Sequence, residues 1–326
     1  MLEKLLAQAQ RCDIETSTIG ITNHLPMALI ALSRLGADDV RLAEYFRFYS
    51  KKTQPLGEPS LRSEFNWAVN LGNKGSFPDY LNFYLGEIHK MGPEAVIHAH
   101  LDTLIKGVSA AAFHALIRLS YGVLHENPTE VAFGLAYMSA HYVLVPAPVA
   151  CQNSPVEILN DALHEFENKA FIGNTISERM LAVSEHPDFL KINKIPKELS
   201  LQRISELVSD LYLASNDFTV LHGVTSCHAM QTVLPYIKDR SAALECYWSG
   251  ILVAVLSVRN LKLTKNGPME VRPLDQLDIN HVISSDDDHL IKLVFSCIEE
   301  YKEYQGLGHL KILNLKVPAK VSPGKK

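Results

Sequence analysis

The chain has 326 residues, of which 47% are hydrophobic and 21% are charged, and its formal net charge is -5. This composition is typical of a globular protein with one large domain or two ordinary ones. The acidic balance argues against a nucleic-acid partner, as does the lack of a basic stripe before the last few residues. Five scattered cysteines without a C-x-x-C motif indicate a reducing compartment, so we expect a cytoplasmic protein without a disulfide framework.

One long apolar segment, residues 131–150, resembles a membrane span at first sight. Pro146 and Pro148 limit its helix to about 15 residues, whereas a bilayer requires roughly 20. We therefore expect a buried helix and no membrane partner. The first turns of the chain carry charges, which predicts neither a signal peptide nor a transit peptide.

Helical periodicity, capping residues and helix breakers predict about ten to twelve helices. The first part of the chain is expected to hold a short helix in residues 1–18, helices near 26–35 and 38–50, a loop over 51–79 with a helical piece around 65–69, and helices beginning at 79, 93, 110 and 128. The second part is expected to hold an amphipathic piece after 158, helices over 201–215, 218–236 and 241–258, and a last helix that begins at the acidic run 284–288.

Period-2 alternation is almost absent, so the predicted fold class is all-α, a bundle-like arrangement of many helices. We expect one large domain over residues 1–315, with a possible hinge in the Pro- and Lys-rich connector 186–200. Residues 316–326 are basic and broken by proline, which predicts a disordered tail.

The segment 218–236 is apolar enough to be buried, yet it contains His222 and His228. Buried polar groups need partners, which makes both histidines candidates for a site. Six residues on a regular helix turn the side chain by about 600°, so the two rings would point about 120° apart. They converge only if Gly223 or another irregularity bends the helix. Otherwise one ring is packed and the other faces a partner.

Four histidines stand in apolar helical surroundings: His24, His114, His222 and His228. Helical bundles build metal sites from single inward ligands on several helices, and neutral imidazole suits Fe, Zn, Cu or Ni. No H-E-x-x-H, E-x-x-H, G-x-G-x-x-G or G-x-S-x-G motif is present. A zinc-dependent hydrolase using metal-bound hydroxide, or a helical binding protein whose histidines belong to the core, would share this pattern.

Five blocks together resemble the signature of the questin oxidase-like family: NHLPMALIALSRLGA (23–37), GVSAAAFHALIRLSYGV (107–123), NPTEVAFGLAYMSAHYV (127–143), DFTVLHGVTSCHAMQTVLPY (217–236) and DDDHLIKLVFS (286–296). The resemblance implies an all-helical oxidoreductase. Fungal members open or cleave rings of anthraquinone-type polyketides with O2, and some are described as NADPH-dependent Baeyer–Villiger-type monooxygenases. Part of the family resembles a mononuclear non-haem iron enzyme with four histidines and a carboxylated lysine.

Carried over to this sequence, the resemblance implies iron ligands at His24, His114, His222 and His228, with Lys292 as the carboxylated lysine. An ammonium group repels a cation, whereas a carbamate supplies an anionic oxygen and forms from a neutral, desolvated amine. The alternative is an ordinary surface Lys292 with His289 as the ligand.

The resulting expectation is an oxygenase that oxidises or opens an aromatic or quinone-like small molecule at iron, with NADPH as a possible electron donor. The substrate wall is expected to include Tyr121, Tyr137, Phe113 and Phe218. Arg118 would orient a phenolate or carboxylate, or form a structural salt bridge. His141 is expected to face the substrate or support the metal site.

Overall fold

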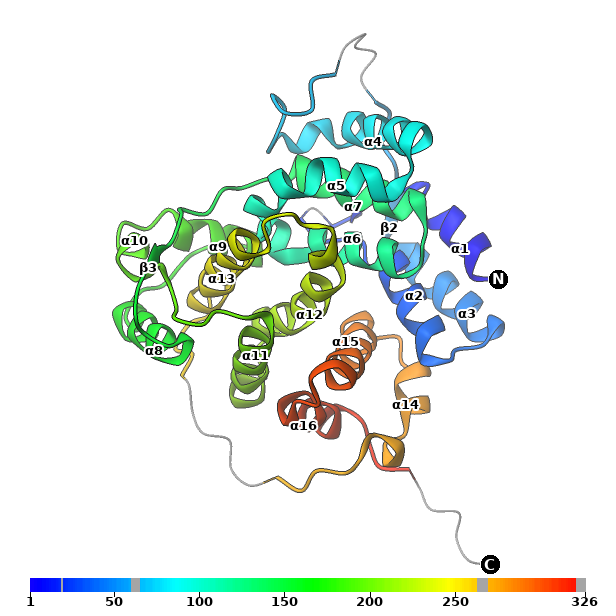
Figure 1. Ribbon diagram of the computed structural model, residues 1–326. Helices are drawn as coiled ribbons and strands as arrows, with labels where there is room; N and C mark the ends of the chain where they lie inside the picture. Colours follow the sequence, from blue (N-terminus) through cyan, green and yellow to red (C-terminus); the bar gives the residue numbers. More distant parts are fainter. Residues whose placement is uncertain (19, 60–64, 263–268, 321–326) are drawn as a thin grey trace, which may run out of the picture.

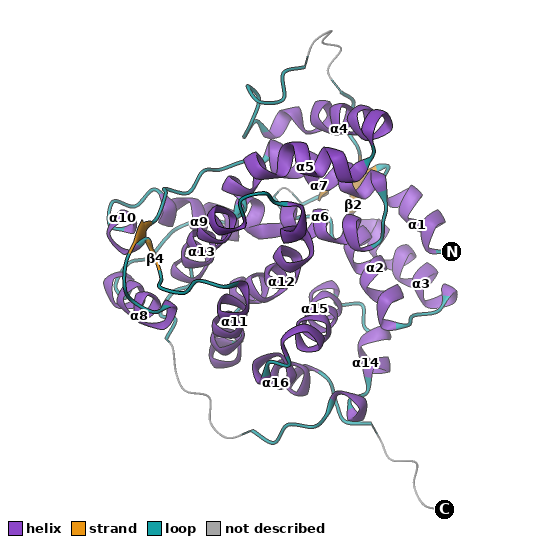
Figure 2. Cartoon of the chain, in the orientation of Figure 1, coloured by secondary structure: helices purple, strands orange, loops and turns teal. Residues whose placement is uncertain are grey.

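The computed structural model describes residues 1–18, 20–59, 65–262 and 269–320. The all-α prediction is confirmed, because these residues form 16 α-helices and only two sheets, each of two short strands (Figure 2). None of the helices in the described ranges is long and apolar enough to cross a bilayer.

The first half of the chain contains α1 (Leu2–Ala9), β1 (Cys12–Thr16), α2 (Leu25–Leu35), α3 (Asp39–Tyr49), β2 (Thr53–Pro55), α4 (Phe77–Met91), α5 (Pro93–Leu104), α6 (His114–Leu124), α7 (Pro128–Ala140), β3 (Val149–Ala150) and α8 (Pro155–Phe166). The second half contains α9 (Ile176–Ser184), α10 (Phe189–Ile192), β4 (Lys194–Ile195), α11 (Leu201–Ser215), α12 (Phe218–Val233), α13 (Arg240–Leu256), α14 (Ile279–Ile283), α15 (Asp288–Tyr304) and α16 (Leu307–Lys316). Short 3-10 turns join several of them, including η2 (Lys74–Ser76) and η4 (Ala110–Phe113).

Helix α12 lies at the centre of the molecule and packs against α6, α11, α13 and α15 (Figure 1). Nearly all of its residues are buried, which explains why its apolar residues show no one-sided pattern. Helices α4 and α5 cover α7, which packs along α6. Helix α2 contacts both α6 and α15. Helices α6 and α15 therefore each contact both α2 and α12.

Glycines allow α6 and α7 to approach closely. A Cβ added at Gly134 of α7 would lie 2.4 Å from the Cα of Leu119 in α6. A Cβ added at Gly122 of α6 would lie 2.7 Å from the backbone nitrogen of Val131 in α7. Both distances are too short for a side chain, so these two glycines set the helix spacing.

Carboxylate caps fix the beginnings of the two helices that matter most for the site. Asp217 accepts hydrogen bonds from the amides of Thr219 and Val220, and Asp287 accepts from those of His289 and Leu290. These caps satisfy amides that have no partner inside the helix. The N-terminal signal predicted at residues 284–288 is thereby confirmed, with α15 beginning at Asp288.

Several predicted boundaries are wrong. Residues 1–18 form α1 followed by β1, which pairs with β2, and residues 67–72 form turns and not a helical piece. The predicted disordered tail begins too early: α16 reaches Lys316, and Lys320 donates its amide to the carbonyl of Gln276. Residues 321–326 lie outside the described residues. The hinge at 186–200 stays a prediction.

Candidate metal centre

Four histidine rings meet where α2, α6, α12 and α15 begin. The His24 ring stacks on that of His114 with centroids 4.8 Å apart, and His114 meets His222 at 4.6 Å. His289 closes the circle, 5.5 Å from His222 and 4.8 Å from His24. We call these four residues the histidine cluster. Each side chain comes from a different helix, so the tertiary fold creates the cluster.

Local backbone structure fixes the position of His24. Its amide donates to the hydroxyl of Tyr49 at 2.9 Å, and the Asn23 side-chain amide donates to the carbonyl of Asp13 at 2.8 Å. Pro26 then begins the helix, as its position in the sequence predicted. The segment before α2 is thus tied to β1 on one side and to α3 on the other.

The outer nitrogens of the cluster are all engaged. His114 Nδ1 lies 2.6 Å from the Ala111 carbonyl oxygen, and His222 Nδ1 lies 2.8 Å from that of Phe218. Asp288 binds His24 Nδ1 and lies 3.1 Å from His289 Nδ1. A carbonyl oxygen can only accept, so Nδ1 of His114 and of His222 carries the ring hydrogen. Such outer partners set the tautomer of metal-binding histidines.

The inner nitrogens consequently face one another as lone pairs. Nε2 of His114 lies 3.1 Å from Nε2 of His222, and both rings have already donated their hydrogen outward. Nε2 of His24 is buried and has no hydrogen-bond partner within the described chain. Burial, followed by neighbouring cationic groups, lowers the pKa of His114 well below its usual range, and burial with Lys292 lowers that of His222 to about 3. A shared proton is therefore disfavoured, and the arrangement fits a metal cation.

Lys292 and Asp288 complete the charged surroundings. Lys292 is 2% exposed and lies one helical turn after His289. Burial lowers its pKa to about 8, although Asp288 and Asp287 oppose the shift. Burial alone would raise the pKa of Asp288, but its hydrogen bond to His24 holds it far below the usual range. Ligand atoms of His24, Asp288 and His289 all lie within 4.8 Å of one another.

The expected convergence of His222 and His228 is wrong. Helix α12 runs without interruption through Gly223, so six residues separate the rings by about 9 Å along the axis as well as by rotation. His228 instead places Nδ1 3.3 Å from the Ser296 hydroxyl and packs its ring 5.3 Å from that of Phe295. His289 occupies the fourth place in the cluster.

A turn of left-handed backbone precedes His114. Ala111, Ala112 and Phe113 have φ angles of 50°, 53° and 65°, which side chains with a Cβ rarely adopt. Each such residue costs about 1–3 kcal/mol, and strain of this kind gathers at functional sites. The turn directs the Ala111 carbonyl at His114, which is the contact that fixes the tautomer.

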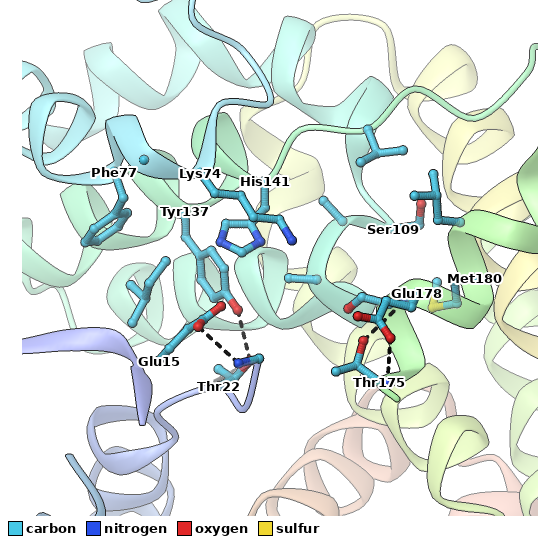
Figure 3. Close-up of a pocket in the computed structure, with 18 of the residues that line it drawn as sticks. Glu15, Thr22, Lys74, Phe77, Ser109, Tyr137, His141, Thr175, Glu178 and Met180 are labelled. Atoms are coloured by element: carbon cyan, nitrogen blue, oxygen red, sulfur yellow. Dashed lines mark hydrogen bonds between the residues drawn. The ribbon is translucent and has the colours of Figure 1, made fainter. Parts of the chain in front are cut away.

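A cavity of about 640 Å3 lies on the other side of this turn. Its wall includes Thr22, two residues before His24, and Ala111, whose carbonyl holds His114. Tyr137 and His141 line it together, with ring centroids 4.7 Å apart, and the Tyr137 hydroxyl hydrogen-bonds Thr22 at 2.9 Å (Figure 3). Its size is that of a pocket for an organic molecule.

Arg118 is not a substrate residue in this structure. The side chain is fully buried, and its Nε donates to Glu130 at 3.0 Å while the guanidinium lies 4.1 Å from the Phe133 ring centre. Arg118 therefore forms the structural salt bridge that the sequence left as an alternative.

The expected aromatic wall is divided among different places. Tyr121 is buried against Phe295, and Phe113 packs against Tyr247, so neither lines the cavity. Phe218 is 51% exposed and covers the cluster from outside, with its ring 4.5 Å from that of His289. Only Tyr137 and His141 lie where a substrate wall was expected.

A known protein family matches most of this chain. The family model described as questin oxidase-like matches residues 21–297, a span that includes all four histidines of the cluster and Lys292. The chain belongs to the questin oxidase-like family.

Three curated relatives illustrate the similarity. Oxidoreductase AflY of Aspergillus parasiticus is 28% identical over 281 residues, which is 71% of this chain and 56% of that protein. The questin oxidase of Aspergillus fumigatus is 22% identical over 289 residues, 72% of this chain and 64% of the relative. Baeyer-Villiger oxidase ptaJ of Pestalotiopsis fici is 25% identical over 136 residues, 38% and 31% of the two chains. The matches thus cover between about a third and two thirds of these relatives.

Asp288 of this questin oxidase-like chain has a role that the sequence pattern did not predict. The sequence pattern predicts Asp288 only as part of a helix start, yet its carboxylate contacts two histidines of the cluster. The available signal was its place directly before His289 and one turn before Lys292, in the first turn of a helix. The carbonyl of Ala111 could not be predicted, because a left-handed turn of two alanines and a phenylalanine has no sequence signature.

Proposed function

We propose that this protein is an oxidoreductase that uses a mononuclear non-haem iron and O2 to oxidise, or to open, a ring of an aromatic polyketide-type molecule. The proposed ligands are His24, His114, His222, His289 and Lys292, the last as a carbamate. This assignment replaces His228 by His289 and retains Lys292, so the two alternatives at α15 become joint members of one site.

The observation that carries the proposal is the pair of facing Nε2 atoms. Two buried imidazoles that each donate outward through Nδ1 leave two lone pairs 3.1 Å apart, with the unpartnered His24 Nε2 beside them. Water or a side-chain donor would normally satisfy such buried nitrogens. A divalent metal satisfies several of them at once, and imidazole suits iron as well as zinc.

Lys292 supports the same proposal. Its lowered pKa leaves about a tenth of the amine neutral at pH 7, against less than a thousandth for an exposed lysine. The neutral nitrogen can form a bond to the carbon of CO2, with loss of one proton to solvent, which gives a carbamate anion. That anion would balance the charge of a site whose other proposed ligands are neutral histidines.

The names of the relatives and the cavity support the proposed oxidation chemistry. The relatives are named questin oxidase, Baeyer-Villiger oxidase and oxidoreductase, which favours oxidation of an aromatic small molecule. Bound iron would supply the activation of O2, which does not otherwise react readily with closed-shell organic molecules. The chain's own residues would orient the substrate against Tyr137 and exclude water through the buried walls.

Oxygen consumption by the purified protein tests the proposal. The protein, loaded anaerobically with Fe(II) and given an anthraquinone such as questin, is expected to consume O2, and zinc-loaded protein is not. Parallel reactions with and without NADPH determine the electron donor. Lys292→Ala should abolish turnover, and Lys292→Arg should not restore it, because a guanidinium stays charged and cannot form the carbamate. Equal activity with zinc, or hydrolysis without O2 uptake, would favour the zinc-dependent hydrolase instead.

A further inference from the structure

The cavity beside the cluster has one wall with a free positive charge. Lys74 lies in η2 and lines the cavity, and no carboxylate of the described residues lies within ion-pair distance of its ammonium group. Figure 3 shows its side chain reaching alongside the His141 ring. Two causes lower the pKa of His141: burial is the larger, and the positive charge of Lys74 is the second. This agrees with the proximity of the two side chains.

His141 presents a buried donor at the same place. It is 8% exposed and caps the C-terminus of α7, where its ring packs edge-on against Tyr137. Neither ring nitrogen has a hydrogen-bond partner among the described residues, although the ring lines the cavity. Burial lowers its pKa to about 4, so the ring is neutral near pH 7 and offers one N–H.

The carboxylates that line the cavity form no ion pair or hydrogen bond with Lys74 or His141 among the described residues. Glu15 accepts the amide of Gly20 at 3.1 Å, and Glu178 accepts the amide of Asn174 at 2.6 Å. Asp13, which also lines the cavity, accepts the amide of Glu15 at 3.2 Å. One oxygen of each carboxylate is thus engaged by a backbone donor, whereas Lys74 and His141 have unused donors. The cavity therefore has donors from Lys74 and His141 and acceptors from Glu15 and Glu178, with the Tyr137 ring between His141 and Glu15 (Figure 3).

We propose that Lys74 and His141 form a subsite for an anionic oxygen, a carboxylate or a phenolate, on the aromatic molecule that enters the cavity. The ammonium group supplies the charge and the imidazole N–H supplies direction, as in other charge-assisted recognition of acidic oxygens. The identification of this molecule as the enzyme's substrate rests on the proposed function, but the anion subsite itself does not.

Binding of two matched probes tests the subsite. Isothermal titration with anthraquinone monocarboxylate and with its uncharged carboxamide compares the same ring system with and without the anionic oxygen. We expect the carboxylate to bind about ten-fold more tightly, and Lys74→Met to remove that preference while Lys74→Arg keeps it. Lys74 is exposed, so these variants should fold normally. Lys238→Met, at an exposed lysine near Asp102, is the control for an equal loss of charge.

The outcomes separate this inference from the proposed function. Equal binding of the two probes, failure of both to bind, or an equal effect of Lys74→Met and Lys238→Met would overturn the subsite. The iron content of each variant is measured in parallel and should be unchanged, because Lys74 does not contact the cluster. A protein that binds no metal but still shows the Lys74-dependent preference would refute the proposed function and leave the subsite standing.

Discussion

The structure predicts opposite results for two histidines that the sequence placed in similar apolar helices. His289→Ala removes a ring that lies within the cluster, 4.8 Å from His24 and 5.5 Å from His222. His228→Ala removes a ring that contacts Ser296 and Phe295 instead. The first change should therefore weaken metal binding, and the second should weaken the fold.

The magnitudes follow from the lost contacts. Loss of a group that only orients a metal ligand lowers metal affinity by about 10- to 100-fold, so loss of a ligand should exceed about 100-fold. His289 is partly exposed, with 21% of its side chain accessible, so its removal should change the free energy of unfolding of the metal-free protein little. Removal of buried His228 breaks one hydrogen bond and leaves a cavity, which should lower that free energy by about 1–3 kcal/mol.

Two measurements on each variant check this prediction. Anaerobic titration with Fe(II) gives the metal affinity, and urea unfolding of the metal-free protein gives the stability. The proposed role of His289 is refuted if His228→Ala loses metal to the same extent as His289→Ala, or if His289→Ala retains wild-type affinity.

Three further predictions concern the scaffold. Arg118→Met or Glu130→Gln alone should lower the free energy of unfolding by about 3–5 kcal/mol, because each change leaves a buried partner unpaired. The double change should cost clearly less than the sum of the two single changes. Additive costs in urea unfolding would contradict the pairing. Gly134→Ala should destabilise the protein by about 1–3 kcal/mol, because its Cβ would overlap Leu119, and an unchanged melting temperature would argue against the close packing of α6 and α7. Burial raises the pKa of Glu300 from 4.5 to about 7, so between these pH values the folded protein keeps a proton that the unfolded chain has lost. The free energy of unfolding should therefore fall by up to about 3 kcal/mol as the pH rises from 4.5 to 7. Glu300→Gln should flatten that part of the profile, and an identical slope in both proteins would show that Glu300 is not responsible.

The sequence predicted most helices, because they are delimited by local signals. Pro26 begins α2, Gly36 ends it, and Asp217 and Asp287 cap the two helices that carry much of the site. The errors arose where local signals were weak or tertiary contacts decided. β1 follows α1 after two residues, and the end of the described chain is held by pairing with residues 276–278.

For the site, the sequence predicted three of the four clustered histidines and the burial of Lys292. It placed His228 in the cluster because both histidines of α12 lie in equally apolar surroundings. Hydrophobicity does not show which side of a buried helix faces the histidines of the neighbouring helices. The two histidines are distinguished by their neighbours. Helices α6 and α15 begin beside His222, whereas His228 lies six residues, or about 1.7 turns, further along α12. Such neighbours follow from the packing of four helices and have no local signal.

The central claim is that the facing nitrogens of the cluster bind one metal ion per chain. Metal-free protein titrated anaerobically with Fe(II), followed by elemental analysis after gel filtration, tests this most directly. We expect about one iron per chain in the wild type. Both His114→Ala and His222→Ala should lose that iron, while helical content measured by circular dichroism stays nearly unchanged. Protein that retains no iron after loading, or variants that bind it as well as the wild type, would contradict the claim.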